Sequence, residues 1–299
     1  MKEIRGGLAH LVRPGAPAVF VTGGPPARPF PGPGPVTFSN PAFALHHARS
    51  WGSPFVLGWM PPLHTLAHPG DDAPRSVIER WLEGLAELSA GGVPPAVQVW
   101  GPLTLAAERE GTAEVLRLAI EDAHAAEQAI AAGLRAVMDV LPRALARARV
   151  ATPPVLAWVA EPMVALLDPE RLQRLWLPVL RRVTATASSA GAEVVVHASG
   201  RALHAVPVAA LAGVGGISVG SGTPLAAAGD ALPAGAVVFG NLDSMRLLDW
   251  DEARLREAGA AMAREMPGRR WVGTPGSAVS ADTPVGALEA FRSGVLGAG

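Results

Sequence analysis

The segment Glu193-Val194-Val195-Val196-His197-Ala198-Ser199-Gly200 is a short apolar run that ends in polar residues and a glycine. Seven other runs of this kind occur along the chain, and stretches with helical periodicity lie between most of them. Most of the runs are apolar on both faces, as parallel strands buried under helices are. We expect eight strands, at residues 18–21, 55–58, 96–100, 155–159, 193–196, 216–219, 236–239 and 270–273.

Helix signals separate these runs. Asp168-Pro169-Glu170 and Asn40-Pro41 each place a capping side chain before a proline at the first helical position. Residues 112–149 carry helical periodicity over a length that indicates two helices or an insertion, and residues 251–265 and 284–295 predict the last two helices. Strands and helices therefore alternate along the chain.

This alternation fits two architectures, a closed barrel and a doubly wound open sheet. Eight candidate strands in 299 residues, without a Gly-rich dinucleotide-binding fingerprint, favour the barrel. We therefore predict a single α/β domain, a (β/α)8 TIM barrel that spans residues 1–299. Residues 23–35 are dense in Gly and Pro and predict an irregular loop near the barrel mouth, either a lid or a stiff connection.

The composition excludes several classes of function. With 49% hydrophobic residues and a formal net charge of −1, the chain can bury a large core and has no charge bias toward nucleic acid or acidic membranes. No apolar run approaches the ~20 residues of a spanning helix, and no N-terminal targeting segment is visible, so we expect a cytoplasmic protein. Cysteine is absent, which removes disulfides, thiol nucleophiles and thiolate metal ligands.

In a (β/α)8 barrel the chemistry lies where strands run into the following loops, so the polar residues after each run are site candidates for a small-molecule substrate. The main ionisable ones are our candidates for catalysis: Glu161 after the fourth run, His197 after the fifth and Asp243 after the seventh. The candidates for substrate binding at the strand ends are Trp59, Met60, Thr104, Ser199, Asn241 and Ser277.

Each ionisable candidate has a functional and a structural interpretation. His197, with an unperturbed pKa of ~6.5, could bind a metal or act as a general base, or it could hydrogen-bond a neighbouring loop. Glu161 could be a metal ligand, a base or the partner of an arginine. Asn241 and Asp243 either shape the site or cap the following turn. The residues alone leave these alternatives open.

Four separated segments share their order with a known superfamily. Gly240-Asn241-Leu242-Asp243, followed by a helix, an apolar run and Thr283-Pro284, is similar to a GNLDP segment and its C-terminal tail. Residues 100–106 are similar to a GPfTlA turn, Glu161-Pro162 to a (D/E)P segment, and His197-Ala198-Ser199-Gly200 to an HxCG turn. From about residue 40 onward the chain thus resembles the uroporphyrinogen decarboxylase and corrinoid-dependent methyltransferase superfamily. The resemblance implies a (β/α)8 barrel, and dimers are common in the superfamily, so a homodimer is an expected assembly.

The methyltransferase branch carries a zinc ion that activates a thiol for methyl transfer, held by the His and Cys of HxC and by a second Cys. The matching positions here are His197, Ser199 and Ser277. A serine hydroxyl is neutral near pH 7 and binds zinc poorly. The resemblance therefore implies either a weak zinc site that His197 forms with Glu161, or a pocket that binds its ligand without metal. It also implies a corrinoid protein as partner.

The decarboxylase branch uses arginines to bind the carboxylates of its tetrapyrrole and an aspartate to stabilise the pyrrole nitrogens. Arg28 lies near the position of the N-terminal arginine segment of that branch, but the segment as a whole has no clear equivalent. The position of the aspartate corresponds to Trp59-Met60, where there is no acid. An apolar mouth on this side argues against a highly anionic ligand.

The resemblance leaves three hypotheses for the function. The first is a methyl-transfer enzyme of the corrinoid type, in which His197 and Glu161 bind a metal or polarise the acceptor while the two serines and residues 241–243 shape the mouth. The second is a tetrapyrrole decarboxylase without a cofactor, in which Arg28 and other loop arginines bind acid groups. The third is a non-catalytic protein that holds a corrinoid, a tetrapyrrole or a protein partner in the barrel mouth.

Overall fold

The described strands form one parallel sheet. The computed structural model describes residues 18–19, 56–57, 72–90, 95–148, 155–276 and 283–297. The strand order is β1-β8-β7-β6-β5-β4-β3-β2. The strands are β1 (Ala18–Val19), β2 (Val56–Leu57), β3 (Pro95–Trp100), β4 (Val155–Ala160), β5 (Ala192–Ala198), β6 (Gly216–Val219), β7 (Val237–Leu242) and β8 (Trp271–Pro275). All eight predicted strands are present.

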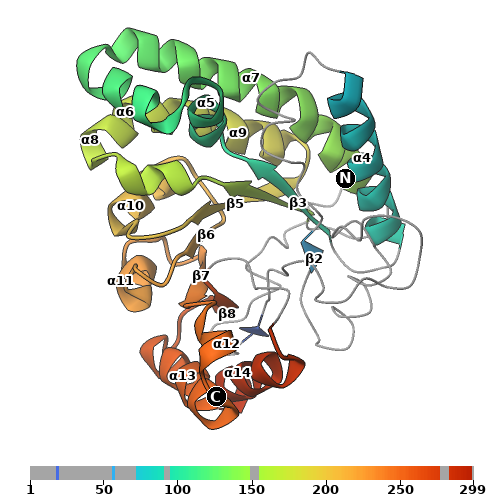
Figure 1. The fold of residues 1–299 in the computed structure, drawn as a ribbon, viewed down its shortest axis with the longest axis vertical. Coiled ribbons are helices and arrows are strands. Elements are labelled where there is room, and N and C mark those ends of the chain that lie inside the picture. The colour runs from blue at the N-terminus through green and yellow to red at the C-terminus, as the bar shows by residue number, and fades with distance from the viewer. Residues whose placement is uncertain are drawn as a thin grey trace.

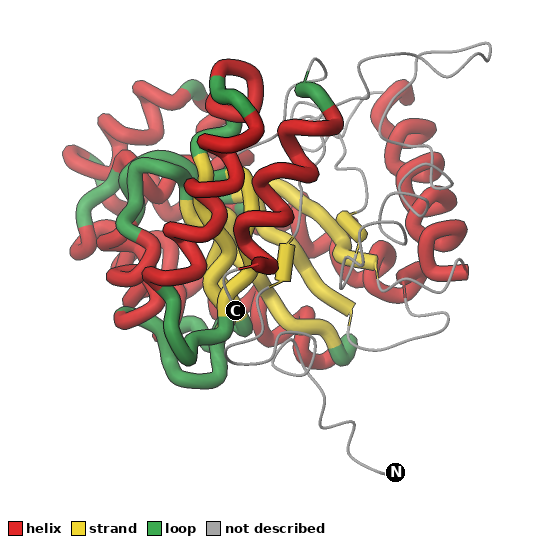
Figure 2. The backbone as a smooth tube through the Cα atoms, turned by 90° about the horizontal axis from the view of Figure 1, so that it is seen from below, coloured by secondary structure: helices red, strands yellow, loops and turns green. Residues whose placement is uncertain are grey.

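The pairing of the first strand with the last one separates the two architectures that the sequence left in competition. β1 pairs in parallel with β8, through Ala18 with Val272 and Val19 with Gly273. Neighbouring first and last strands are a property of a closed barrel, whereas a doubly wound sheet starts in its middle. Figure 2 shows the strands together at the centre with the helices outside them. The arrangement is that of the predicted (β/α)8 barrel.

The helices follow the strands in chain order and form the outer layer (Figure 1). The long ones are α4 (Asp72–Ala90), α5 (Pro102–Glu110), α6 (Thr112–Glu121), α7 (Ala123–Ala148), α9 (Leu177–Ser189), α13 (Glu252–Glu265) and α14 (Val285–Gly297). The short ones are η1 (Pro162–Leu166), α8 (Pro169–Arg171), η2 (Leu172–Trp176), η3 (Leu203–Ala205), α10 (Val206–Leu211), α11 (Leu225–Asp230) and α12 (Arg246–Asp249).

Capping side chains begin the helices where the sequence predicted them. The side chain of Asp168 accepts a hydrogen bond of 2.8 Å from the backbone N of Arg171, directly before Pro169 at the start of α8. Asp251 does the same for α13 through the backbone N of Arg254, at 2.8 Å. The long periodic stretch is two helices, α6 and α7, which separate at Asp122. The Asn40-Pro41 start lies outside the described residues.

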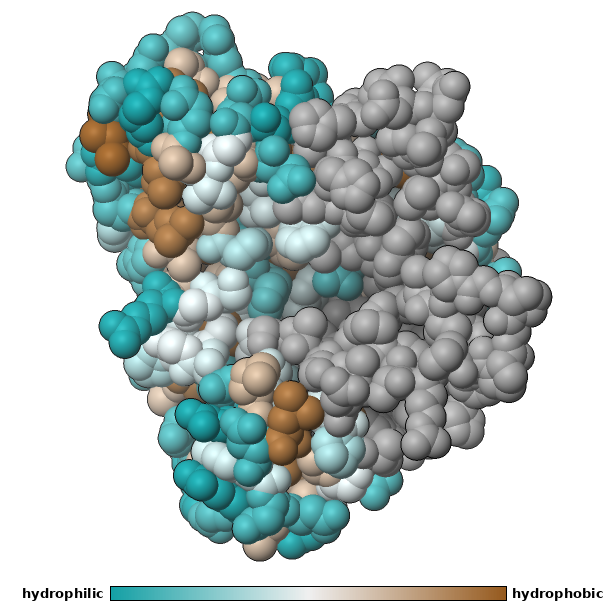
Figure 3. Space-filling model, viewed as in Figure 1, coloured by the Kyte–Doolittle hydropathy of each residue, from teal (hydrophilic) through white to brown (hydrophobic). Residues whose placement is uncertain are grey.

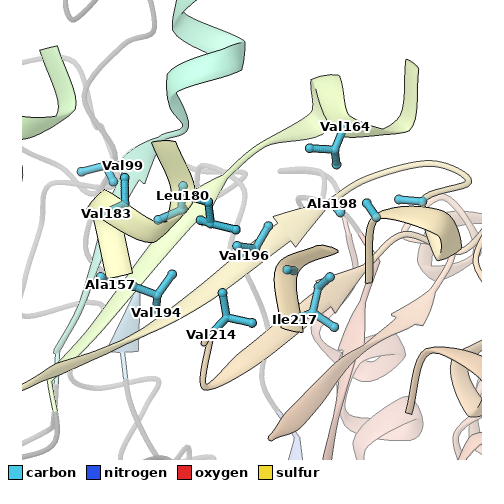
Figure 4. Packing of buried hydrophobic residues seen from close by; sticks show 14 of the residues in the cluster. Val99, Ala157, Val164, Leu180, Val183, Val194, Val196, Ala198, Val214 and Ile217 are labelled. Carbon is cyan, nitrogen blue, oxygen red and sulfur yellow. The ribbon is translucent and has the colours of Figure 1, made fainter. Parts of the chain in front are cut away.

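Two separate apolar clusters lie on the two faces of the sheet. The interior of the barrel is filled by Ala96, Leu156, Trp158, Val195, Val237, Phe239 and Val272. A larger cluster lies between the sheet and the helices, where Val194 and Val196 of β5 pack near Leu180 and Val183 of α9 (Figure 4). Because successive side chains of a strand point to opposite faces, membership of these clusters shows which way each strand residue points.

Four strands, β4, β5, β7 and β8, extend further at their C-terminal ends than the sequence predicted, and in β5 and β7 this changes where candidate site residues lie. β5 continues through Ala198 and β7 through Leu242. His197 and Asn241 therefore belong to strands and not to the following loops, so strand alternation fixes the face of the sheet on which each lies. Residues 23–35, the predicted loop near the mouth, lie outside the described part of the chain.

The described surface is mostly polar. Figure 3 shows hydrophilic residues over most of the coloured part of one face, with separate apolar spots. The exposed large apolar side chains are Ile120, Leu166, Leu211, Met245 and Leu296. Within the described residues, no helix is both long and apolar enough to span a bilayer.

Candidate functional site at the carboxyl ends of the strands

His197 lies inside the barrel near the C-terminal end of β5. Val195, two residues earlier on the same strand, belongs to the interior cluster, so His197 points to the same face. The strand register places His197 beside Ala160 of β4 and beside Ser218 of β6. The prediction that this histidine lies at the working end of the barrel is consistent with this position.

The imidazole of His197 is held by one hydrogen bond and one aromatic neighbour. Its Nδ1 is 2.9 Å from Oγ of Ser218. Its ring lies nearly parallel to that of Trp158, with 6.2 Å between the centroids and 22° between the planes. Burial lowers the pKa of His197 to about 4, so the side chain is uncharged at neutral pH.

Glu161 lies on the opposite face, between the sheet and the helices. It follows β4, in which Trp158 points inward, so alternation turns Glu161 outward. Its Oε1 accepts hydrogen bonds from N (2.6 Å) and Oγ1 (2.5 Å) of Thr104, and its Oε2 accepts from N of Leu103 and Nε1 of Trp176, each at 3.3 Å. The carboxyl group therefore caps the start of α5 and connects it to the π-helical turn η2.

The side chain of Glu161 has no contact with solvent. The side chain is 0% exposed, and this burial raises its pKa to about 7, although the hydrogen bonds from Thr104, Leu103 and Trp176 act in the opposite direction. The backbone before α5 must come close to the carboxylate, because a Cβ at Gly101 would lie 2.0 Å from Oε2 of Glu161. Gly101 and Thr104, in the segment that resembles the GPfTlA turn, thus both serve this contact.

The structure does not bring the side chains of Glu161 and His197 together. Their backbones are joined, since N of Glu161 donates to O of His197 at 2.8 Å, but the side chains point to opposite faces of the sheet. The pairing of these two side chains on one metal ion, which the sequence suggested, has no support in this geometry. No cluster of three or more His, Asp or Glu side chains suited to a metal ion occurs among the described residues.

The two polar residues of the 241–243 segment have different surroundings. Nδ2 of Asn241 donates to O of Gly220 (3.0 Å) and to O of Thr223 (2.5 Å), which ties β7 to the loop after β6. Oδ1 of Asp243 accepts from N of Met245 at 3.1 Å, and its Oδ2 is 3.5 Å from Nε of Arg246. These contacts agree with the interpretation of Asp243 as a turn cap.

The remaining predicted site residues divide into two groups. Thr104 is buried on the outer face of the sheet through its bonds to Glu161, whereas Ser199 follows His197 by two positions and is partly buried. Arg28, Trp59, Met60 and Ser277 lie outside the described residues. Ser218 is a contact of the site that the sequence analysis missed. The signal was present, because Ser218 is a polar residue inside the apolar run 216–219.

Residues 67–295 match the family described as uroporphyrinogen decarboxylase (URO-D). The chain belongs to the URO-D family. The match includes both Glu161 and His197, and it confirms the membership that the four sequence segments predicted. None of the curated proteins matches the chain in sequence.

Solved structures are similar to this URO-D family member, and a methyltransferase among them shares its fold. A methyltransferase from Methanosarcina mazei matches with a TM-score of 0.75 and 17% identity, over 93% of both chains. D-psicose 3-epimerase with D-tagatose from Clostridium cellulolyticum H10 matches with a TM-score of 0.47 and 9% identity, over 95% of this chain and 96% of that chain. At such low identity the first likeness shows the fold alone, and the second is too distant to support an inference.

The zinc ion of the methyltransferase branch does not fit the described residues. His197 offers a single nitrogen, Nε2, because Nδ1 is engaged with Ser218. Ser199 offers a neutral hydroxyl, and the carboxylate of Glu161 is on the other face of the sheet. Catalytic zinc sites use three protein ligands, commonly His, Cys, Asp or Glu. Within the described part of the chain, one imidazole does not meet this requirement.

Proposed function

We propose that this URO-D family member is a methyl-transfer enzyme in which His197 binds and polarises the methyl acceptor through a hydrogen bond. The observation that carries the proposal is the position of His197. Among the described strands, His197 is the only ionisable side chain on the inner face near the C-terminal ends. This end of a (β/α)8 barrel is where substrates bind. The branch is supported by the similarity of residues 197–200 to the HxCG turn.

The chemistry of methyl transfer gives His197 a defined task. When a methyl group leaves a methylcobamide, both electrons of the cobalt–carbon bond stay on cobalt, so the acceptor supplies the electron pair of the new bond. A thiolate supplies this pair far better than a thiol does. An N–H group that faces the acceptor stabilises its anionic form and lowers its pKa. A neutral, partly buried imidazole is suited to this, because hydrogen bonds are stronger in a site of low polarity.

The described inner face favours a ligand of low charge. Near the C-terminal ends of β4 to β8, the inward positions other than His197 are uncharged: Ala160, Ser218, Phe239, Asn241 and Thr274. A porphyrinogen with many carboxylates would need cationic partners to compensate for its desolvation. The described strand ends supply none. The methyl donor, a methylcobamide on a corrinoid protein, would come to this mouth from outside the barrel.

The test is a two-substrate assay on the full chain. In one arm the protein is incubated anaerobically with methylcobalamin and a small thiol, and the loss of methylcobalamin is followed by its absorbance. In the other arm it is incubated with uroporphyrinogen, and coproporphyrin is measured after oxidation. His197→Ala tests the site, and His124→Ala, an exposed histidine on α7, is the matched control.

Each outcome decides between the hypotheses. We expect thiol-dependent loss of methylcobalamin that His197→Ala slows by about 100-fold and His124→Ala preserves. Turnover of uroporphyrinogen would replace the proposal with the decarboxylase hypothesis. Binding of methylcobalamin or porphyrin without turnover in either arm would instead identify a non-catalytic binding protein.

A further inference from the structure

Ser218 of β6 lies directly beside His197 of β5. The strand register pairs the two residues, and both point into the barrel. Neighbouring strands are about 4.8 Å apart, so inward side chains at paired positions stand side by side. The result is the 2.9 Å contact between Oγ of Ser218 and Nδ1 of His197, at a serine that is only 2% exposed.

We infer that Ser218 is a positioning residue that donates its hydroxyl proton to Nδ1 of His197 and so keeps the ring proton on Nε2. This inference rests on the proposed function of His197. A neutral imidazole has one donor and one acceptor nitrogen, so a donor at Nδ1 leaves the N–H group at Nε2. The hydrogen bond thus decides which chemical group His197 offers to a ligand.

The direction of the hydrogen bond follows from the needs of the serine. If Nδ1 were the donor, the hydroxyl proton of Ser218 would need a second acceptor. Within the described residues, this hydroxyl makes only one hydrogen bond, the one with His197. A buried donor without an acceptor destabilises the folded state. Donation from Ser218 to Nδ1 avoids this cost.

The consequence is a defined class of ligand. Among the described residues no hydrogen bond involves Nε2 of His197, so its N–H group is available to a ligand in the mouth. The matching ligand atom is an electron-rich acceptor, such as a thiolate sulfur or an anionic oxygen. A metal cation does not match, because it binds the unprotonated nitrogen of a neutral imidazole. The nearly parallel ring of Trp158 restricts rotation and helps to keep this orientation.

The test is nitrogen NMR of the ligand-free full chain with ¹⁵N-labelled histidine at neutral pH, in which the signals of His197 are assigned by their loss in His197→Ala. We expect Nε2 to resonate in the range of a protonated ring nitrogen and Nδ1 in the range of an unprotonated, hydrogen-bonded one. Ser218→Ala should move the Nδ1 signal toward the range of a nitrogen without a hydrogen bond, and Ser218→Thr should restore it. Ser189→Ala, at an exposed hydroxyl on α9, should leave both signals unchanged.

Two results would overturn the inference. One is a protonated Nδ1 with an unprotonated Nε2 in the wild-type protein, which would make Ser218 the acceptor and suit a base or a metal ligand. The other is an Nδ1 signal that Ser218→Ala does not change. The measurement needs no turnover, so its outcome is independent of the methyl-transfer assay. NMR can show the Nε2-protonated tautomer in a protein without methyl-transfer activity, and an active protein can show the other tautomer.

Discussion

Glu161 and His197 end neighbouring strands and are joined by a backbone hydrogen bond of 2.8 Å, yet their side chains have opposite surroundings. The carboxylate of Glu161 is fully buried outside the barrel and accepts hydrogen bonds from Leu103, Thr104 and Trp176. The imidazole of His197 lies inside the barrel, partly buried, with Nδ1 bound to Ser218. Both carboxyl oxygens of Glu161 therefore have hydrogen-bond partners within the protein, whereas Nε2 of His197 is available to a ligand.

This difference shows that the face of the sheet decides the role of an ionisable residue at a strand end. Both residues satisfy the general expectation for a barrel enzyme, which places chemistry where strands meet their following loops. Only an inward side chain reaches the space where a substrate binds. An outward one meets the helix layer, and there a carboxylate stabilises the N-terminus of a helix.

The largest effect that we expect on the Glu161 side of this comparison is a loss of stability. Both oxygens of a carboxyl group can accept hydrogen bonds in either protonation state, whereas an amide nitrogen cannot, so Glu161→Gln loses hydrogen bonds from Thr104 or Trp176 in a buried site. The free energy of unfolding should fall by about 3 kcal/mol, measured by urea denaturation. Glu127→Gln, at an exposed position on α7, should change it little. Equal stability of the two variants would show that Glu161 is not a structural cap.

On the His197 side the largest effect should be on turnover. Loss of one N–H group that stabilises an anionic reacting atom lowers kcat by about 100-fold. We expect His197→Ala to do this in the methyl-transfer assay while the unfolding free energy changes by about 1 kcal/mol. The contrast with Glu161 disappears if His197→Ala unfolds the protein and leaves the turnover of the remaining folded fraction unchanged.

The two residues should also give stability opposite dependences on pH. Because the folded-state pKa of Glu161 is raised from 4.5 to about 7, its stabilising contribution is complete below pH 4.5 and is lost as the pH rises through 7. The folded-state pKa of His197 is lowered from 6.5 to about 4, so its contribution is complete above pH 6.5 and is lost as the pH falls through 4.

Urea denaturation of the two variants across this pH range checks the prediction. Glu161→Gln should remove a decline in stability toward neutral pH, and His197→Ala should remove a decline toward acid. Parallel pH profiles for the wild-type protein and both variants would contradict the assigned environments.

The smallest effect is expected at Asp243. Its side chain is partly exposed and accepts from N of Met245, a contact that an asparagine oxygen can also make. Asp243→Asn should therefore change the unfolding free energy by less than about 0.5 kcal/mol and leave methyl transfer nearly unchanged. A large loss of turnover in this variant would indicate that Asp243 takes part in catalysis.

The sequence was sufficient for the positions of the strands but not for the faces of their residues. Apolar runs bounded by glycine and polar residues marked all eight strands, because buried parallel strands need such runs. The same runs are apolar on both faces, so they carry no alternation that would distinguish the outward Glu161 from the inward His197. Ser218, inside the run 216–219, was the available sign of a polar inward position.

Other contacts could not be predicted because they depend on the packing of distant elements. Trp176 reaches Glu161 from the π-helical turn η2, and no local pattern marks that turn in the sequence. The turn-capping role of Asp243 was among the alternatives that the sequence left open, and its contacts agree with it. The predicted positions Arg28, Trp59, Met60 and Ser277 remain predictions.

The central claim is that His197 works as a hydrogen-bond donor without a metal, while Glu161 supports the fold. The most direct test is the metal content of the full chain, purified without chelators or a polyhistidine tag, with His197→Ala as the control. We predict no stoichiometric zinc in either protein. About one zinc ion per chain in the wild-type protein, absent from His197→Ala, would contradict the account, because His197 would then be a metal ligand despite the missing thiolates.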